Sequence, residues 1–295
     1  MENSIPSSEQ DIQAMREFSA RLAASARSCV VDFEENIRMS EMRANWRMWK
    51  HAGRLLGYAF IDDFNNIWFD TEPEHALACE VEAEVIAWGL ACIQKRNQAD
   101  GAENTLDSTC RADNPQRIQL LVEHGFVVQP ARTLRYSRSL SNPIVAHQLP
   151  AGFSIRPAQG KNEVERLVAL HRAAFGTDNM TVEQRLAMMN TPGYRAELDL
   201  VLAAPDHALA AFCVCGFEDR QEKIGFTDPI GTHRQYQGRG LGKALVSAGL
   251  LALQSAGAQV AELGTSSENI GMQKLASALG FECVSEKMWF SRTVV

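Results

Sequence analysis

In the second half of the chain, polar and apolar residues follow the periods of helices and strands. Helical spacing of apolar residues is clearest over residues 241–255. Thr181 and Gln184 have the spacing of a capping box, which predicts that another helix starts there. Short apolar runs bounded by turn residues predict strands. The other elements expected here are strands over 153–156, 198–204, 209–217, 223–233 and 260–263, a closing strand around 289, and helices over 162–175 and after 269.

The order of these elements indicates a fold class. Several strands follow one another as hairpins and do not alternate regularly with helices, so a doubly wound nucleotide-binding fold is disfavoured. The pattern predicts an α/β (α+β) architecture with a mixed, mostly antiparallel sheet flanked by helices. The first half shows a weaker pattern, with helices expected over 11–26 and 78–94, strands over 46–49 and 57–61, and a polar loop over 98–105.

An internal repeat relates the two halves. Asn114 and Asn269 each stand eleven positions before a Gly-Phe pair, with an amphipathic helical segment in between. Each pair is soon followed by a similar strand-like segment, at 134–138 in the first copy and 288–292 in the second. A linker over 139–152 contains two prolines and few periodic apolar residues. The sequence therefore predicts two copies of one fold, in domains 1–144 and 145–295.

Composition narrows the functional classes. The 295 residues are 45% hydrophobic and 22% charged, typical of a globular protein, with a net charge of −7 and a pI near 5.6. This charge makes nucleic acid an unexpected partner. The acidic excess lies in the first half, so the second half is better suited to an anionic ligand. No signal segment and no apolar run of spanning length is visible, which predicts a cytoplasmic protein with no membrane partner. Seven cysteines without a C-x-x-C pair indicate reduced, buried thiols and no metal site.

The most informative segment runs Gln-Gly-Arg-Gly-Leu-Gly-Lys-Ala over 237–244, between a predicted strand and a predicted helix. Glycines there let backbone N–H groups approach a phosphate closely, and the helix N-terminus adds positive potential. A nucleotide-binding P-loop is excluded because Gln237 and Ala244 stand where it needs Gly and Ser or Thr. The dinucleotide fingerprint fails because its third glycine would be Lys243 or Leu245. A glycine-rich tight turn without a ligand remains an alternative.

Gln237-x-x-Gly240-x-Gly242 resembles the acetyl-CoA pyrophosphate loop of the GNAT N-acetyltransferase superfamily. Residues 229–236 resemble that family's fourth strand, and Asn269 with Gly280-Phe281 resembles the helix that follows. With the repeat, the chain is similar to tandem GNAT proteins such as the mycothiol synthases. The first copy has no such glycine loop between residues 68 and 114, so we expect it to be degenerate, with a structural or substrate-shaping role.

The resemblance implies acetyl-CoA as cosubstrate. The backbone of Ile230, Gly231 and Thr232 would pair with the pantetheine arm like an added strand. Asn269 would contact the cofactor near the thioester, although it also has the position of a helix cap. The residues implied to hold the pyrophosphate are Gln237, Gly238, Arg239, Gly240, Leu241, Gly242 and Lys243.

The catalytic groups are less well defined. Many family members carry a Tyr that protonates the departing thiolate seven residues after the Asn, where this chain has Ala276. Water, a hydroxyl such as Tyr236 or Ser277, or unassisted departure would replace it. An amine must lose a proton before it attacks, and the candidate bases are Asp228 and His233. Asp228 is preferred; it could equally be a solvated carboxylate, and His233 fits a structural role.

The resulting hypothesis is an acetyltransferase that moves the acetyl group of acetyl-CoA directly to a primary amine of a small molecule or peptide. Two alternatives stay open. A non-catalytic acyl-CoA-binding sensor or scaffold is motivated by Ala276 and the degenerate first copy. The second alternative is an enzyme that transfers a longer acyl group from its CoA thioester.

Overall fold

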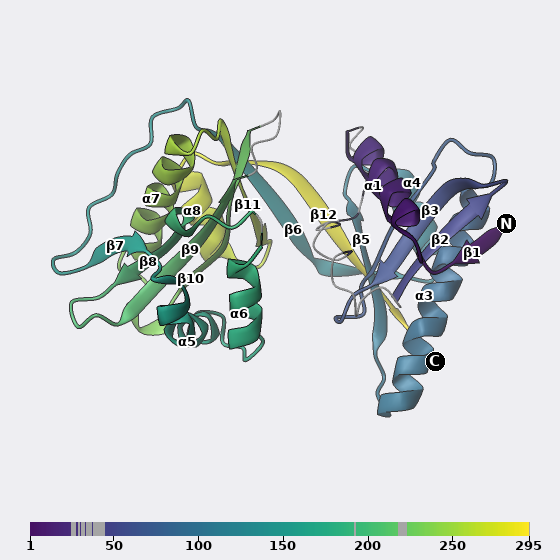
Figure 1. Ribbon diagram of the computed structural model, residues 1–295, viewed down its shortest axis with the longest axis horizontal. Coiled ribbons are helices and arrows are strands. Elements are labelled where there is room, and N and C mark those ends of the chain that lie inside the picture. The colour runs from purple at the N-terminus through teal and green to yellow at the C-terminus, as the bar shows by residue number, and fades with distance from the viewer. Residues whose placement is uncertain are drawn as a thin grey trace. The chain divides into compact units, whose positions relative to one another are not determined.

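The computed structural model describes residues 1–24, 28, 30, 33, 37, 45–191, 193–217 and 223–294 (Figure 1). The chain forms two compact units, Met1–Arg132 with Glu286–Val295, and Thr133–Ser285. Two strands, β6 (Val127–Ser139) and β12 (Glu282–Thr293), contribute residues to both units. The units therefore differ from the predicted domains 1–144 and 145–295 in where residues 133–144 and 286–295 belong.

The first unit contains an antiparallel sheet in the order β1-β2-β3-β4. Strand β5 touches the end of this sheet through an isolated parallel bridge, Asn66 to Asp107, and pairs antiparallel with the last part of β12.

The prediction of a polar loop over 98–105 is partly wrong, because α3 continues to Asp100 and ends at Gly101, whose φ is +64°. The elements are β1 (Glu2–Ser4), α1 (Glu9–Ala24), β2 (Trp46–His51), β3 (Arg54–Ile61), β4 (Ile67–Thr71), α3 (Ala78–Asp100), β5 (Thr105–Arg111) and α4 (Pro115–Glu123).

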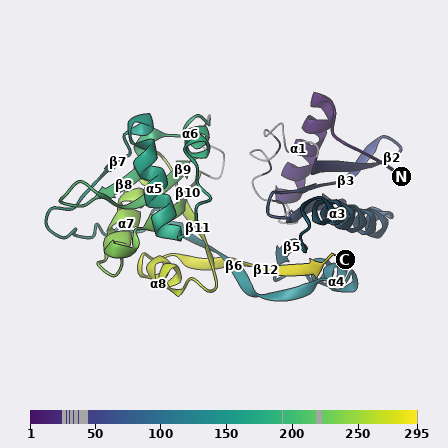
Figure 2. The ribbon, with the colours of Figure 1, turned by 90° about the horizontal axis from the view of Figure 1, so that it is seen from below.

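Helices α1 and α3 cover opposite faces of this sheet (Figure 2). Strand β3 supplies both cores, because side chains alternate across a strand. Tyr58 and Phe60 pack with α1, whereas Ala59 and Ile61 pack with α3. The Trp46 ring stacks on Phe60 with centroids 4.2 Å apart. The first half thus has an apolar core of its own on each side of its sheet.

The second unit contains a sheet in the order β6-β11-β10-β9-β8-β7. Strands β10 and β11 run parallel, and the other neighbours in this order are antiparallel. The predicted α+β class with mixed, mostly antiparallel sheets is confirmed. The elements are β7 (Ser154–Pro157), α5 (Val164–Phe175), α6 (Val182–Met189), β8 (Asp199–Ala203), β9 (Leu209–Phe217), β10 (Ile224–Thr232), α7 (Leu241–Ser255), β11 (Val260–Ser266) and α8 (Ile270–Ala278).

Two apolar cores sandwich this second sheet. Leu200 and Leu202 of β8 pack in the core that contains α7 and α8, whereas Val201 between them packs in the core that contains α5. The capping box at the start of α6 is confirmed. Thr181 Oγ1 accepts a hydrogen bond from the Gln184 amide at 3.1 Å, and the Gln184 side chain accepts one from the Thr181 amide at 2.9 Å.

Both copies of the repeat form equivalent elements, and the closing strand of each copy pairs with a strand of the other copy. Strand β6 of the first copy pairs with β11, and β12 of the second copy pairs with β5. The two registers are equivalent, because Arg138 lies opposite the second residue of β11 and Arg292 lies opposite the second residue of β5. Arg138 donates a hydrogen bond to the carbonyl of Leu279 at the end of α8, and Arg292 donates one to the carbonyl of His124 at the end of α4.

Cysteine burial follows the prediction only in part. Cys110, Cys213 and Cys215 are buried, but the expectation of burial is wrong for Cys79 and Cys283, which are exposed. Cys92 is half-buried, and Cys29 lies outside the described residues. None of the helices in the described part of the chain is long and apolar enough to cross a membrane.

Candidate functional site

Strands β10 and β11 form a fork in the second unit. Their parallel pairing covers only residues 224–226 of β10 and 260–262 of β11. Beyond this point β10 continues to Thr232 while pairing with β9, and β11 continues to Ser266 while pairing with β6. Because the two strands no longer pair with each other there, their facing backbone groups can bind an extended ligand between them.

The glycine-rich turn lies directly after β10 and leads into α7. Gly238 and Gly240 have φ values of +75° and +76°, a conformation that glycine adopts most easily. Gly240 occupies the N-cap of α7 without a side-chain cap, and the first intrahelical bond runs from the Ala244 amide to the Gly240 carbonyl at 3.2 Å. The amides of residues 241–243 therefore point out of the helix N-terminus, which is a favourable place for an anion.

Side chains around the turn hold it in shape and add positive charge. Gln237 donates to the carbonyl of Thr232 at 3.1 Å, so the glutamine fixes the start of the turn. The Arg239 guanidinium lies over the Tyr236 ring, 5.5 Å from its centroid, and donates to the Gln235 carbonyl at 3.2 Å. Arg239 is exposed and Lys243 is half-buried, and both stand within the predicted pyrophosphate loop.

Three predicted cofactor residues also have packing roles. Leu241 is buried in the core, so only its backbone can face a ligand. A Cβ on Gly242 would lie 3.2 Å from Leu275 of α8, so the glycine allows α7 and α8 to approach closely. A Cβ on Gly231 would lie 2.4 Å from the Phe212 ring and 2.9 Å from Ala174, so this glycine is required where β10 meets α5.

Asn269 caps its helix in the structure. Its side-chain oxygen accepts the Met272 amide at 3.0 Å, and the equivalent Asn114 accepts the Arg117 amide at the same distance. The side-chain amide N–H₂ of Asn269 does not take part in this cap, and the residue is exposed. The capping role is therefore established, and contact with a cofactor stays a prediction.

Asp228 lies at a bulge in β10. Thr227 pairs with Cys215 and Ile230 pairs with Cys213, so two residues of β10, Asp228 and Pro229, stand opposite one residue of β9. The peptide bond between Asp228 and Pro229 is cis. Asp228 is exposed, and its Oδ2 would lie 3.6 Å from a Cβ on Gly264 of β11. The carboxylate thus reaches over the fork toward β11.

The structure does not bring His233 and Asp228 together. His233 follows Asp228 by five positions along an extended segment, which corresponds to roughly 16 Å at about 3.3 Å per residue. His233 Nδ1 accepts the Gln235 amide at 3.2 Å at the start of a short 3₁₀ turn over Arg234–Tyr236. The His233 amide donates to the Ala210 carbonyl at 2.9 Å. These contacts describe a residue that shapes the exit from β10.

The Tyr that the resemblance implies for this position of α8 is Ala276 in this chain. Ala276 is fully buried in the core shared by α7 and α8, where a tyrosine ring would not fit. Ser277 beside it is exposed. Tyr236 is half-buried, with its ring 6.1 Å from that of Phe153 and 5.8 Å from that of His233.

A further carboxylate, Glu262, lies on the same face of β11 as Gly264. Ala261 and Leu263 face the core of α7, so Glu262 and Gly264 of the same strand face the opposite side, toward which Asp228 reaches. Glu262 is 7% exposed and forms an ion pair with Arg135 at 3.2 Å. The sequence signal for this carboxylate was a glutamate that stands between two apolar residues, Ala261 and Leu263, in a predicted strand.

A buried polar cluster supports the same face and was also missed. Arg185 of α6 forms an ion pair with Asp199 at 2.5 Å, and the Tyr194 hydroxyl donates to the same carboxylate at 2.7 Å. Burial and this carboxylate raise the pKa of Tyr194. The ring of His171 stacks at 5.6 Å on Phe212, the ring that packs on Gly231, and burial with the nearby Arg185 lowers the pKa of His171. These contacts fix α5 and α6 against β8 and β9.

The first copy lacks the corresponding anion site. Its connection from β4 to α3 reads Glu-Pro-Glu-His-Ala-Leu over residues 72–77, without glycine. His75 Nδ1 accepts the Leu77 amide at 3.2 Å, and the His75 carbonyl accepts the Ala78 amide at 3.0 Å. Glu80 stands at the third helical residue, where α7 carries Lys243. Two of the amides are thus used internally, and a carboxylate stands where α7 has an ammonium group, which disfavours a pyrophosphate.

Among the residues that the structure describes, no three or more His, Cys, Asp or Glu side chains gather in a way that could hold a metal ion.

Comparisons with known proteins agree with this geometry. Residues 165–281 match the acetyltransferase (GNAT) family model. A mycothiol acetyltransferase from Salinispora arenicola is 27% identical over 251 residues, covering 82% of this chain and 79% of that protein. A mycothiol acetyltransferase from Nocardia farcinica is 27% identical over 280 residues, covering 91% of this chain and 89% of that protein.

Solved structures show the same fold over the whole chain. A GCN5-related N-acetyltransferase from Sphaerobacter thermophilus superposes with a TM-score of 0.79 at 18% identity, covering 99% of this chain and 95% of that chain. A tandem GNAT protein from the clavulanic acid biosynthesis pathway gives 0.74 at 14% identity, covering 100% and 99%. The predicted tandem GNAT architecture is confirmed.

Proposed function

We propose that this chain, whose residues 165–281 match the GNAT family model and whose fold is that of tandem GNAT structures, transfers the acetyl group of acetyl-CoA directly to a primary amine of a small molecule or peptide. The observation that carries the proposal is the continuous arrangement of the β10/β11 fork, the glycine turn and the uncapped start of α7. The fork offers backbone groups to an extended arm, and the turn offers amides to a diphosphate.

In this proposal the cofactor is bound largely by backbone groups. Amides of residues 238–243 hold the pyrophosphate, with Arg239 and Lys243 supplying charge. The open edge of Ile230 to Thr232 pairs with the pantetheine amides. This arrangement directs the thioester toward the β10 bulge, because the arm follows β10 from the turn back toward Asp228.

Asp228 acts as the base in the proposed reaction. It accepts a proton from the amine, and the neutral nitrogen then attacks the thioester carbonyl, forming the N–C bond as the C–S bond breaks. The sulfur leaves as a thiolate and takes a proton from water or from a nearby hydroxyl, since Ala276 supplies none. The carboxylate is well placed for this role because the bulge carries it over the fork.

The acceptor is proposed by class. Its amine approaches from the side of the sheet that carries Asp228 and Glu262, opposite α7 and α8. Two relatives are mycothiol acetyltransferases, which makes deacetylated mycothiol one rational member of an acceptor panel. The identity to both is 27%, so other small amines and peptide N-termini belong in the panel as well.

The test follows thiol release from acetyl-CoA with each amine of the panel, for the wild type and for Asp228→Asn. We expect at least one amine to be acetylated, and the variant to lose on the order of 10²-fold or more in turnover at neutral pH. The loss should shrink at high pH, where an amine of pKa near 10 is already neutral. A loss that is equal at all pH values would assign Asp228 a positioning role.

One observation favours a second candidate function, a non-catalytic acyl-CoA sensor. The position of the usual acid is occupied by the buried Ala276. Binding of acetyl-CoA without turnover of any amine in the panel would support the sensor and contradict the enzyme. Turnover with a longer acyl-CoA alone would keep the enzyme and change the acyl group.

A further inference from the structure

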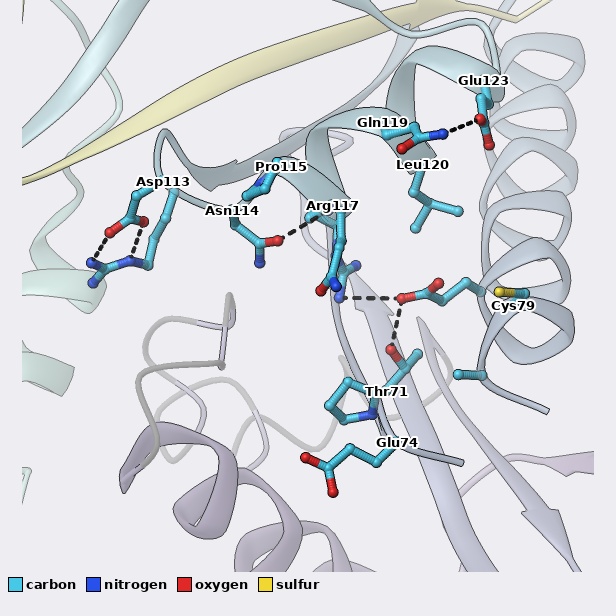
Figure 3. A pocket seen from close by; sticks show the side chains of 15 residues that line it. Thr71, Glu74, Cys79, Asp113, Asn114, Pro115, Arg117, Gln119, Leu120 and Glu123 are labelled. Carbon is cyan, nitrogen blue, oxygen red and sulfur yellow. Dashed lines mark hydrogen bonds and ion pairs between the residues drawn. The ribbon is translucent and has the colours of Figure 1, made fainter. Parts of the chain in front are cut away.

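The first unit contains a large cleft at the place where the second unit carries its fork and glycine turn. It has a volume of about 940 Å³ and lies between the end of β4, the start of α3, the end of β5 and α4. Figure 3 shows its walls, with Thr71 and Cys79 on one side and Asn114 and Arg117 on the other. A cleft of this volume accommodates a small molecule.

The chemistry of this cleft differs from that of an acyl-CoA site. Four carboxylates, Glu74, Glu82, Asp113 and Glu123, line it against two guanidinium groups, Arg111 and Arg117. The lining is therefore net negative, and two amides at its helix start, those of Leu77 and Ala78, are already bonded to His75. A ligand with several phosphates is repelled, whereas a ligand with an ammonium group is attracted.

Arg117 is an incompletely satisfied donor in the wall of the cleft. Its side chain is 8% exposed, and its guanidinium carbon lies 3.8 Å from the centroid of the Phe69 ring. Its Nη1 is buried and has no hydrogen-bond partner among the residues that the structure describes. Figure 3 shows the side chain directed from α4 toward Thr71 across the cleft. A buried guanidinium N–H without an acceptor is costly, and a ligand oxygen would satisfy it.

Glu82 stands next to this donor in the wall of the cleft and forms a loose ion pair with it. One carboxylate oxygen accepts the Thr71 hydroxyl at 2.9 Å and lies 3.9 Å from Arg117 Nη2, beyond hydrogen-bond distance. The acid and the guanidinium are thus neighbours without a tight bond between them. A cation that binds Glu82 and an anion that binds Arg117 can sit side by side.

We propose that this cleft of the first copy binds a zwitterionic amine of the amino-acid class, whose carboxylate pairs with Arg117 and whose ammonium faces Glu82. This site is separate from the proposed acetyl-transfer site and does not rest on that function. The zwitterion fits because it supplies both the missing acceptor and a counter-charge for the acidic lining. An anion alone would satisfy Arg117 but be repelled by the surrounding carboxylates, and a simple amine would leave Arg117 Nη1 without a partner.

The experiment is a calorimetric titration of the full chain with free L-leucine, L-lysine and L-glutamate, each in turn. Leucine is also compared with 3-methylbutylamine and 4-methylpentanoate, which each lack one of its two charged groups. We expect one of the amino acids to bind with one site per chain. We expect leucine to bind at least about tenfold more tightly than its matched amine and acid, since each analogue loses one charge-assisted contact. Saturating acetyl-CoA should not displace the amino acid.

Three variants locate the binding. Cys79→Trp fills the cleft from an exposed position in the first turn of α3 and should abolish binding. Cys283→Trp, the same change at an exposed position outside the cleft, should leave the Kd unchanged. Arg117→Met keeps the contact with Phe69 but removes the guanidinium, and should raise the Kd at least about tenfold; its fold is checked by thermal unfolding.

Several results would overturn the proposal. These are no binding of any of the three amino acids to the wild type, binding that survives Cys79→Trp, and an acid or amine analogue that binds as tightly as its amino acid. Displacement by acetyl-CoA would show that the ligand occupies the cofactor site. None of these outcomes depends on acetyl transfer, so failure here and failure of the proposed function are distinguishable.

Discussion

Replacing Gly240 with Asp tests the cofactor loop most sharply, because Asn offers a control of the same size. Gly240 stands at the N-cap of α7 with φ at +76°, and none of the described atoms lies within 4 Å of a Cβ placed on it. Asn and Asp both tolerate this conformation better than other side chains, at a cost of about 1 kcal/mol. The two variants should therefore fold similarly and differ in one negative charge.

The charge is expected to weaken acetyl-CoA binding strongly. At about 5 Å, two unit charges interact by about 0.8 kcal/mol in water and about 3 kcal/mol at an effective dielectric constant of 20. A pyrophosphate carries about two negative charges, so the added repulsion is about 2 to 6 kcal/mol. The Kd of Gly240→Asp should exceed that of Gly240→Asn by at least about 30-fold, and the ratio should fall as salt is added.

Calorimetric titration of acetyl-CoA into both variants and the wild type measures this ratio. Thermal unfolding of the three proteins checks that they are equally folded. If Gly240→Asp and Gly240→Asn bind acetyl-CoA equally well, the pyrophosphate does not lie at the start of α7 and the loop assignment is wrong.

Three further predictions concern packing, pH and chain boundaries. Gly231→Ala should destabilise the protein by about 1 to 3 kcal/mol through overpacking, while Gly216→Ala, in open space on the neighbouring strand, should cost nothing in urea unfolding. Burial lowers the pKa of His171 below its usual 6.5 in the folded state, so the unfolded chain binds more protons and wild-type stability should fall as pH drops from 7 to 5. His171→Phe should weaken that dependence, as read from urea midpoints. A chain of residues 145–295 should fail to show a cooperative unfolding transition because it lacks 133–144, whereas the full chain should show one.

Local features of the fold followed from the sequence. The capping box at Thr181, the Asn cap of α8 and the glycine turn each depend on residues a few positions apart, so their spacing was sufficient. The equivalence of the Asn114 and Asn269 segments was also visible. The nearly equal φ values of +78° at Gly125 and +77° at Gly280 show how closely the two copies agree.

Features that depend on distant residues could not be predicted. The two closing strands carry similar sequences and equivalent registers, so nothing local indicates that β6 completes the sheet containing β11. Strand β5 was missed because it places Ser108 among its buried residues, which hides the apolar alternation. Gly231 was interpreted only as a cofactor residue, since its packing partner Phe212 comes from another strand.

The central claim is that one acetyl-CoA binds per chain, at the glycine turn of the second unit, while the cleft of the first unit is closed to it. Equilibrium dialysis of the full chain against labelled acetyl-CoA measures this directly. We predict saturation at one acetyl-CoA per chain, lost in Gly240→Asp and retained in Cys79→Trp. Saturation at two per chain, or a single site that is lost in Cys79→Trp and retained in Gly240→Asp, would contradict the account.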